Sequence, residues 1–179
     1  MSRQLLVKIH LYLATFLTPI LLLIATSGGL YLLGYKGNVE RQQVYQGAAA
    51  EINLKAEDKT AEIKRFLTEK NLNTNFEYVK DRGTIFQTRP TSKDYYQISI
   101  KGDTVTVVEE KPDFVKSMVE LHKGHGPSLF KTLQQLTAIG LTFILLSGLW
   151  IALVTPPMRK TALLLSGSGL AVILVLIFL

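Results

Sequence analysis

Three histidines are the residues of this chain best suited to ligand chemistry. His10 lies near the start of the chain, whereas His122 and His125 lie close together much later. A neutral imidazole can ligate a metal ion, and it can exchange a proton near neutral pH. The chain has no cysteine, which excludes a thiolate nucleophile, an iron–sulfur cluster and a disulfide framework. Metal or cofactor ligation is therefore expected at histidine.

The spacing of His122 and His125 favours a small ligand. On a continuous helix, residues three apart share one face with Cβ atoms about 5–6 Å apart, which suits a bare metal ion. Gly124 and Gly126 interrupt that regularity, so other roles stay open. His122 would also be favoured at the end of a helix by the helix dipole, and His125 would shape the turn before Pro127.

No catalytic residue is predicted. Glu109, Glu110 and Asp113 are acids close together in sequence, but a solvated strand end explains them without catalysis. Every histidine lies close to an apolar segment, whereas a serine-protease-like triad needs one in a pocket. His10 itself would serve equally as an interfacial residue at the end of a membrane helix.

Three long apolar segments indicate a membrane protein. No charged side chain occurs in residues 11–34, 132–158 or 161–179. Each segment is long enough to cross a bilayer, which takes about 20 apolar residues. A cleavable signal peptide ending near Ala25-Thr26-Ser27 is the alternative for the first segment, but the apolar run continues to Leu33. Pairs of small residues four apart predict helix contacts, namely Ala25 with Gly29, Gly148 with Ala152, and Gly167 with Ala171.

The charges predict the orientation. Arg3, Lys8, Arg159 and Lys160 lie outside the region from Glu40 to Glu120 that contains all 14 acidic residues. The positive-inside rule places these basic flanks in the cytoplasm and residues 36–128 outside, with the C-terminus at the outer face. We expect a bacterial inner-membrane protein with a cytoplasmic N-terminus and a periplasmic domain. The mixed charges of that domain do not form a nucleic-acid-binding face.

The segment between the first two spans reads as a small α+β domain. Residues 58–71 predict an amphipathic helix with Ala61, Ile63, Phe66 and Leu67 as its apolar stripe. Four β-signals follow at 75–80, 83–89, 95–101 and 103–110, with Phe76 and Tyr78 on one face of the first and Gly102-Asp103 as a tight hairpin turn. The fold class is an α+β membrane protein in which a helix and an antiparallel sheet are inserted between the first and second of three transmembrane helices. The expected segments are a leader and first span (1–35), a linker (36–56), the domain (57–112), a juxtamembrane helix and turn (113–128), the second span (129–155), a cytoplasmic turn (156–160) and the third span (161–179).

The chain resembles the PepSY-associated transmembrane (PepSY-TM) family. The residues that carry the resemblance are His10 in KIHLYL, the SGG near the end of the first span, the LH-x-G segment at 121–124, and the SGLW at 147–150. Larger members have further helices and a longer outer region, so this chain looks like a compact three-span form.

The resemblance implies two alternative functions. Some members of the group are similar to inner-membrane ferric reductases, in which histidines ligate b-type haem. By that analogy His10, His122 and His125 would bind haem b in a subunit that passes electrons to an iron chelate. One protomer cannot pair His10 with the others across a span, so a homo-oligomer or a partner membrane subunit is implied. PepSY modules elsewhere regulate peptidases, which implies instead a non-catalytic, membrane-anchored module that binds a peptidase or another envelope protein.

Overall fold

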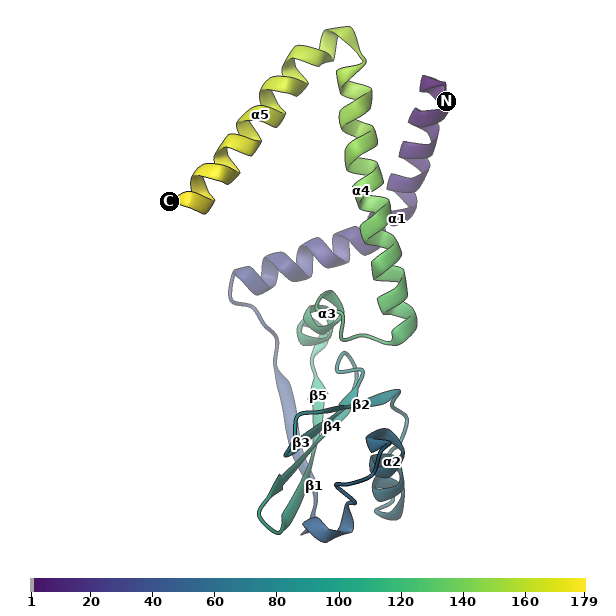
Figure 1. Cartoon of the computed structure of the whole chain (residues 1–179), viewed down its shortest axis with the longest axis vertical. Coiled ribbons are helices and arrows are strands. Elements are labelled where there is room, and N and C mark those ends of the chain that lie inside the picture. Colours follow the sequence, from purple (N-terminus) through teal and green to yellow (C-terminus); the bar gives the residue numbers. More distant parts are fainter. Residues whose placement is uncertain (1) are drawn as a thin grey trace. The chain divides into compact units, whose positions relative to one another are not determined.

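The computed structural model describes residues 2–179. The chain begins with a helix, continues through the strands and a helix that packs on them, and ends with three helices (Figure 1). Their order is α1 (Arg3–Leu32), β1 (Val39–Ala48), η1 (Ala49–Glu51), α2 (Lys59–Glu69), β2 (Tyr78–Asp81), β3 (Ile85–Arg89), β4 (Tyr95–Lys101), β5 (Thr104–Pro112), α3 (Phe114–His122), α4 (Ser128–Leu153) and α5 (Pro156–Phe178).

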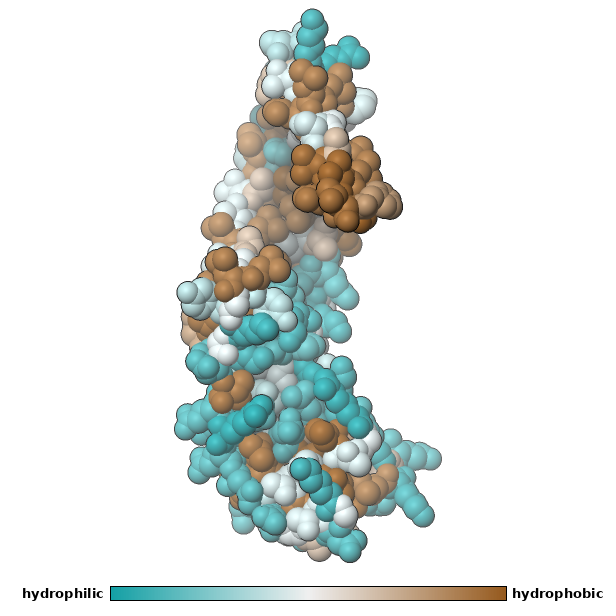
Figure 2. Space-filling model, turned by 90° about the vertical axis from the view of Figure 1, so that its left-hand side faces the viewer, coloured by the Kyte–Doolittle hydropathy of each residue, from teal (hydrophilic) through white to brown (hydrophobic). Residues whose placement is uncertain are grey.

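The chain divides into two compact units, which are described separately. The helical unit comprises Met1–Leu21 and Gln135–Leu179, and the sheet unit comprises Leu22–Gln134. Within residues 2–179, α1, α4 and α5 are the 3 helices long and apolar enough to cross a membrane. Brown, apolar side chains cover much of these helices in Figure 2, whereas teal, hydrophilic side chains dominate the surface of the sheet. The chain is therefore a membrane protein with an α+β fold, as the sequence predicts.

The helix boundaries differ from the expected ones at two places. Residues 156–160 were expected to form a turn, but α5 begins at Pro156 and only Val154 and Thr155 lie between the helices. Proline is compatible with the first helical turn because its missing N–H would have no partner there. Likewise α1 begins at Arg3, so the basic leader is the first part of the membrane helix.

The sheet has five antiparallel strands in the order β1-β5-β4-β3-β2. The predicted hairpin turn is confirmed, because Lys101 pairs with Thr104 and leaves Gly102 and Asp103 as the two loop residues. Gly102 has a φ of 56°, a conformation that glycine adopts at little cost. In the turn between β2 and β3, the Asp81 carboxylate accepts the amide of Gly83 at 2.7 Å.

The core of the sheet unit lies between one face of the sheet and α2. Ile63, Phe66 and Leu67 of α2 are buried, and the Asp58 side chain caps the helix by accepting the amides of Thr60 and Ala61. From the strands come Phe86, Tyr96, Ile98, Ile100, Val105 and Val107. Two expectations were wrong: Ala61 is exposed, and Tyr78 is 45% exposed. The alternation fails at Tyr78 because β2 begins there, while Phe76 precedes it in irregular backbone.

The expected linker at 36–56 was the largest error in the fold. Residues Val39–Ala48 form β1, which pairs with β5 along its length, from Val39 opposite Pro112 to Ala48 opposite Thr104. A register shift between Gln43 and Tyr45 interrupts the alternation of β1. This irregularity and the glutamine-rich sequence explain why the strand was not predicted. Apolar and polar residues alternate along the sequence only where a strand is regular and half-buried.

Several contacts tie α3 and α4 to the sheet within the sheet unit. The amide of Thr91 donates to the carbonyl of His125 at 3.1 Å. The Glu77 carboxylate, just before β2, accepts the amide of Ser128 at 2.9 Å and its hydroxyl at 2.7 Å. Ser128 is the first residue of α4, so a side chain of the sheet domain caps this helix. The positions of α3 and of the first turn of α4 are therefore linked to the sheet.

Candidate functional site

His122 packs against a serine and a glycine of α1. We call these residues, Ser27, Gly28 and His122, the Ser27 site. The Nδ1 atom of His122 lies 2.9 Å from the carbonyl oxygen of Ile24 and 3.3 Å from Oγ of Ser27. A Cβ atom added at Gly28 would lie 3.0 Å from Cε1 of the ring, so glycine is what allows this approach. Ser27 is completely buried.

These partners fix which imidazole nitrogen holds the proton. A carbonyl oxygen only accepts hydrogen bonds, so Nδ1 of His122 must be the N–H. The Ser27 hydroxyl donates to the carbonyl of Ile24 at 3.0 Å, which leaves its oxygen to accept from the same N–H. The Nε2 atom of a neutral His122 therefore keeps its lone pair and is available as a ligand.

His10 makes the same kind of contact in the helical unit. The residues Ser147, Gly148 and His10 form what we call the Ser147 site. Nδ1 of His10 lies 2.9 Å from Oγ of Ser147, and the Ser147 hydroxyl donates to the carbonyl of Ile144 at 3.1 Å. A Cβ atom at Gly148 would lie 3.2 Å from Cε1 of the ring. Because the Ser147 hydroxyl donates to Ile144, its oxygen is left to accept from Nδ1 of His10, and Nε2 makes no hydrogen bond within residues 2–179.

The two sites are reciprocal in sequence. The first span holds His10 and the Ser27-Gly28 pair, while α3 and α4 hold His122 and the Ser147-Gly148 pair. The serines and glycines are the residues that histidine-based reasoning missed. The signal for them is present, since SGG and SGLW are the small-residue motifs of these spans. Neither the pairing of these motifs with histidine nor the role of the hydroxyl is visible in one sequence.

The helix contacts predicted at the pairs of small residues are only partly present. Gly148 contacts the His10 ring rather than a helix backbone, and Gly140 allows Leu17 of α1 to approach α4. A Cβ at Gly29 or Gly167 would meet no atom of residues 2–179 within 4 Å. The predicted contacts at these two glycines are therefore not made within the described chain.

An apolar cavity of about 420 Å³ lies beside the Ser27 site. Its polar lining residues are Ser27, Tyr31, His122 and Lys123. Its walls come from α1 and α3, and the lining residues are Ser27, Gly28, Tyr31, Leu32, Val119, His122 and Lys123. An apolar cavity lined by an imidazole suits a flat, largely apolar molecule with a metal centre that the imidazole can ligate.

His125 belongs to a separate ionic cluster built on Glu120. Nδ1 of His125 lies 2.7 Å from Oε2 of Glu120. The Thr91 hydroxyl donates to the same oxygen at 2.8 Å, and Lys116 and Lys123 pair with Oε1 at 2.9 and 3.2 Å. Glu120 is 5% exposed, so these partners compensate a buried charge. The signal that reasoning from histidines overlooked is the carboxylate five residues before His125.

The protonation states in this cluster follow from its geometry. Burial opposes the ionisation of Glu120, but hydrogen bonds from His125, Lys116 and Thr91 outweigh burial and lower its pKa to about 2. Burial lowers the pKa of His125, although the hydrogen bond to Glu120 opposes this. At neutral pH a neutral His125 thus donates Nδ1–H to an ionised Glu120.

His122 and His125 are engaged separately. Nδ1 of one bonds to α1 and Nδ1 of the other bonds to Glu120. Among residues 2–179, no three histidine, aspartate or glutamate side chains are grouped as a metal site. Metal ligation by His122 and His125 stays a prediction.

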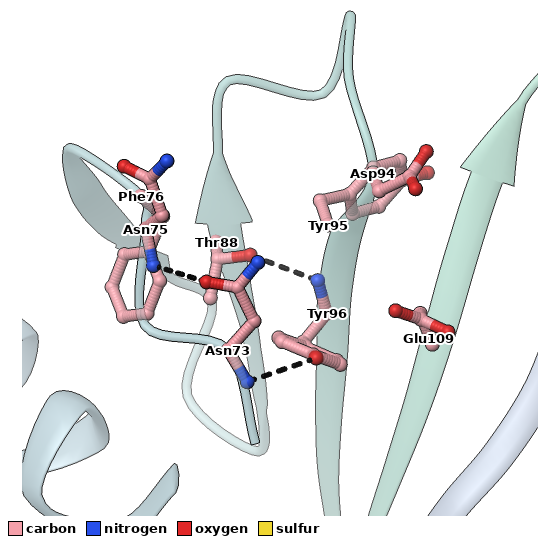
Figure 3. Close-up of a pocket in the computed structure, with 8 residues that line it drawn as sticks. All are labelled: Asn73, Asn75, Phe76, Thr88, Asp94, Tyr95, Tyr96 and Glu109. Carbon is pink, nitrogen blue, oxygen red and sulfur yellow. Dashed lines mark hydrogen bonds between the residues drawn. The ribbon is translucent and has the colours of Figure 1, made fainter. Parts of the chain in front are cut away.

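A smaller hollow on the sheet has no room for a substrate (Figure 3). Its volume of about 30 Å³ holds one or two water molecules. Hydrogen bonds drawn in Figure 3 join residues of this hollow: Asn73 N donates to the Tyr96 hydroxyl at 3.3 Å, and Tyr96 N donates to Thr88 Oγ1 at 2.8 Å. These bonds brace the chain before β2 against β3 and β4.

Comparison with known proteins decides the family. The model of the PepSY_TM-like family matches residues 41–179. The chain belongs to the PepSY_TM-like family. The match covers His122, His125 and the Ser147-Gly148 pair of this PepSY_TM-like protein, whereas His10 and the Ser27-Gly28 pair precede it. No curated protein and no solved structure matches the chain.

Proposed function

We propose that this PepSY_TM-like protein is a haem-b-binding or haem-assisting subunit of a bacterial inner-membrane system that passes electrons to extracytoplasmic iron. A bound b-type haem supplies one-electron transfer. The residues proposed to serve it are His122 and His10, with His125 in a supporting role. The chain would act as a non-catalytic subunit or as part of a ferric-reductase-like enzyme.

The observation that carries the proposal is the free Nε2 of two histidines. In both the Ser27 site and the Ser147 site, Nδ1 faces a hydrogen-bond acceptor, and a glycine brings the ring close to the neighbouring helix. Hydrogen bonds from the second imidazole nitrogen orient metal-bound histidines and raise their basicity. A histidine that merely held a helix end at the membrane surface would not need both features.

The cavity beside His122 fits a porphyrin on one side. Its apolar walls match the apolar ring of a porphyrin. Lys123 also lines the cavity, although its ammonium is paired with Glu120 at 3.2 Å. His122 is the only histidine that lines this cavity within residues 2–179, so a second histidine for the haem would have to come from another chain. A homodimer or a partner membrane subunit is therefore part of the proposal.

The proposed orientation places the sheet domain in the periplasm. The four basic residues of the helical unit, Arg3, Lys8, Arg159 and Lys160, have no acidic residue in their unit. The positive-inside rule then assigns this end to the cytoplasm, and the sheet domain, between α1 and α4 in the chain, to the opposite side. Electrons would leave towards an iron chelate on that side.

The test is a reduced-minus-oxidised spectrum of the full chain, purified in mild detergent from cells supplied with a haem precursor. We expect low-spin b-type bands that are lost in His122→Ala and restored when imidazole is added to that variant. Imidazole can occupy the space left by the side chain, so rescue separates a lost ligand from a misfolded protein. His125→Ala should keep the bands. A wild-type protein without bands, before and after haem is added, would remove the proposal.

The position of β1 favours a second candidate function. This strand lies at the edge of the sheet, with β5 on one side only. Unpaired backbone groups at a sheet edge bind extended peptide segments by strand addition. In this alternative, the sheet domain is a membrane-anchored PepSY module that binds a peptidase or another envelope protein.

Photocrosslinking separates this candidate from the first. A crosslinking residue at exposed Gln42 of β1 should capture a partner in intact cells, whereas one at exposed Lys101 of β4, which is not an edge strand, should not. Equal capture at both positions, or capture at neither, would argue against binding at the β1 edge. Haem bands together with no capture at Gln42 would favour the redox function.

A further inference from the structure

A groove at the turn between α4 and α5 combines apolar walls with basic residues. Its volume is about 650 Å³. Arg159 and Lys160 supply its charge, and its lining residues are Trp150, Leu153, Val154, Pro156, Arg159, Lys160 and Leu163. Figure 1 shows α5 diverging from α4 after this turn, so the groove opens between two helices of the same unit. Neither proposed histidine site includes any of these residues.

The charge of this groove is not balanced by the protein. The segments 1–21 and 135–179, which form the helical unit, contain no aspartate or glutamate. In the part of the chain that the structure describes, neither Arg159 nor Lys160 forms an ion pair, and both are exposed. Two adjacent cations therefore lie at the rim of an apolar groove without a counter-ion.

A third cation is held at the same turn. A guanidinium nitrogen of Arg3 donates to Oγ1 of Thr155 at 3.1 Å. The Thr155 hydroxyl donates to the carbonyl of Ile151 at 2.6 Å, so its oxygen is free to accept from Arg3. Thr155 lies between Val154 and Pro156, which both line the groove. The bond thus places the first turn of α1 beside the basic rim.

The membrane environment of the groove indicates which kind of molecule fills it. The residues of α5 are unburied, and the groove residues Trp150 and Leu163 are 61% and 55% exposed. An apolar groove at the end of membrane helices borders acyl chains rather than water, and arginine and lysine near helix ends extend to the headgroup layer. Basic pockets between membrane helices bind anionic lipid headgroups.

We propose that this groove binds an anionic glycerophospholipid. The phosphate would pair with Arg159 and Lys160, with Arg3 close by, and one acyl chain would lie between Trp150 of α4 and Leu163 of α5. A free phosphate would use only the charges and leave the apolar walls uncovered, so the lipid accounts for more of the site. This inference does not depend on haem binding.

The experiment is native mass spectrometry of the full chain, delipidated in detergent and then exposed to equal amounts of phosphatidylglycerol and phosphatidylcholine. We expect the wild-type protein to retain phosphatidylglycerol preferentially. Arg159→Gln with Lys160→Gln should reduce that retention by at least about tenfold. The matched control is Lys55→Gln with Lys101→Gln, which removes the same charge from exposed positions of the sheet unit and should retain the lipid normally.

Two outcomes of the retention experiment would overturn the proposal. One is equal retention of the two lipids by the wild-type protein, a result that does not depend on how any variant folds. The other is equal loss in the groove variant and the control, which would indicate attraction by net charge alone. Glycerophosphoglycerol, which has the headgroup but no acyl chains, serves as a competitor. It should displace little lipid, and efficient displacement would indicate an anion site instead.

Discussion

At the scale of single residues, two histidines are oriented by serines rather than by carboxylates. Each serine hydroxyl donates to a carbonyl of its own helix, so its oxygen is committed to accept from the imidazole. This arrangement fixes the tautomer without placing a charge within an apolar span, where an unpaired carboxylate would be costly. His125, outside the spans, is held instead by the ionised Glu120.

Adjacent glycines in the first span allow a sharp test of the Ser27 site. Gly28→Ala places a Cβ atom 3.0 Å from the His122 ring, whereas Gly29→Ala meets no atom of residues 2–179 within 4 Å. Alanine favours a helix over glycine by about 1 kcal/mol, so Gly29→Ala should be neutral or stabilising. Gly28→Ala should lower the thermal unfolding temperature relative to it. Equal unfolding temperatures in detergent would show that the ring does not depend on this glycine.

The Glu120 cluster predicts a particular pH dependence. Because its pKa is lowered from 4.5 to about 2, the ionised Glu120 stabilises the fold above pH 4.5, and this stabilisation is lost as the pH falls towards 2. Glu120→Gln should therefore destabilise the protein at pH 7, by roughly 2 kcal/mol. The difference from wild type should shrink as the pH falls below 4.5.

Thermal unfolding of both proteins between pH 7 and pH 3 measures this effect. Glu57→Gln is the control, since Glu57 is exposed. A deficit in Glu120→Gln that stays constant over the whole pH range would contradict the assigned charge state.

At the scale of elements, the local sequence pattern predicted the strands with regular alternation. It missed the strand that depends on pairing with a segment far away in the sequence. The strand Tyr95–Lys101 was predicted at its observed bounds because Tyr96, Ile98 and Ile100 are buried at every second position. In contrast, β1 has mostly exposed side chains and is a strand because β5 lies beside it, so its own residues do not signal it. The site follows the same rule. The histidines could be named from residue type, but their serine and glycine partners are far away in sequence.

The cap of α4 is testable at this scale. Glu77→Gln weakens the acceptor for the amide and hydroxyl of Ser128, and loss of a helix cap typically costs about 1 kcal/mol. We expect faster hydrogen exchange of the amides in residues 128–131, with no change in the middle of α4. Glu57→Gln should leave the exchange rates unchanged. Unaltered exchange in Glu77→Gln would show that the carboxylate contributes nothing to the start of α4.

At the scale of the whole molecule, the separation of charges is the feature that predicts the orientation in the membrane. All 14 acidic residues lie between Glu40 and Glu120, whereas the helical unit has basic residues only. The spans and the charge asymmetry could be predicted from composition alone, because they depend on no tertiary contact. The position of α5 could not be predicted, because its apolar residues surround the helix and do not mark one face for packing.

The absence of cysteine makes the orientation simple to measure. Single cysteines introduced as Lys101→Cys and Met158→Cys report on the sheet domain and on the turn between α4 and α5. In intact cells whose outer membrane has been permeabilised, a membrane-impermeant maleimide should label the first variant and label the second only after the inner membrane is lysed. The reverse pattern would contradict the periplasmic assignment of the sheet domain.

The cap that Glu77 provides also bears on the order in which this protein is made. Residue 77 leaves the ribosome long before residue 128, so the sheet domain can fold while the next apolar segment is still being synthesised. The first turn of α4 then meets a carboxylate that is already in place to receive its amide and hydroxyl. The domain that is synthesised first would thus act as an internal template for where the following membrane helix begins.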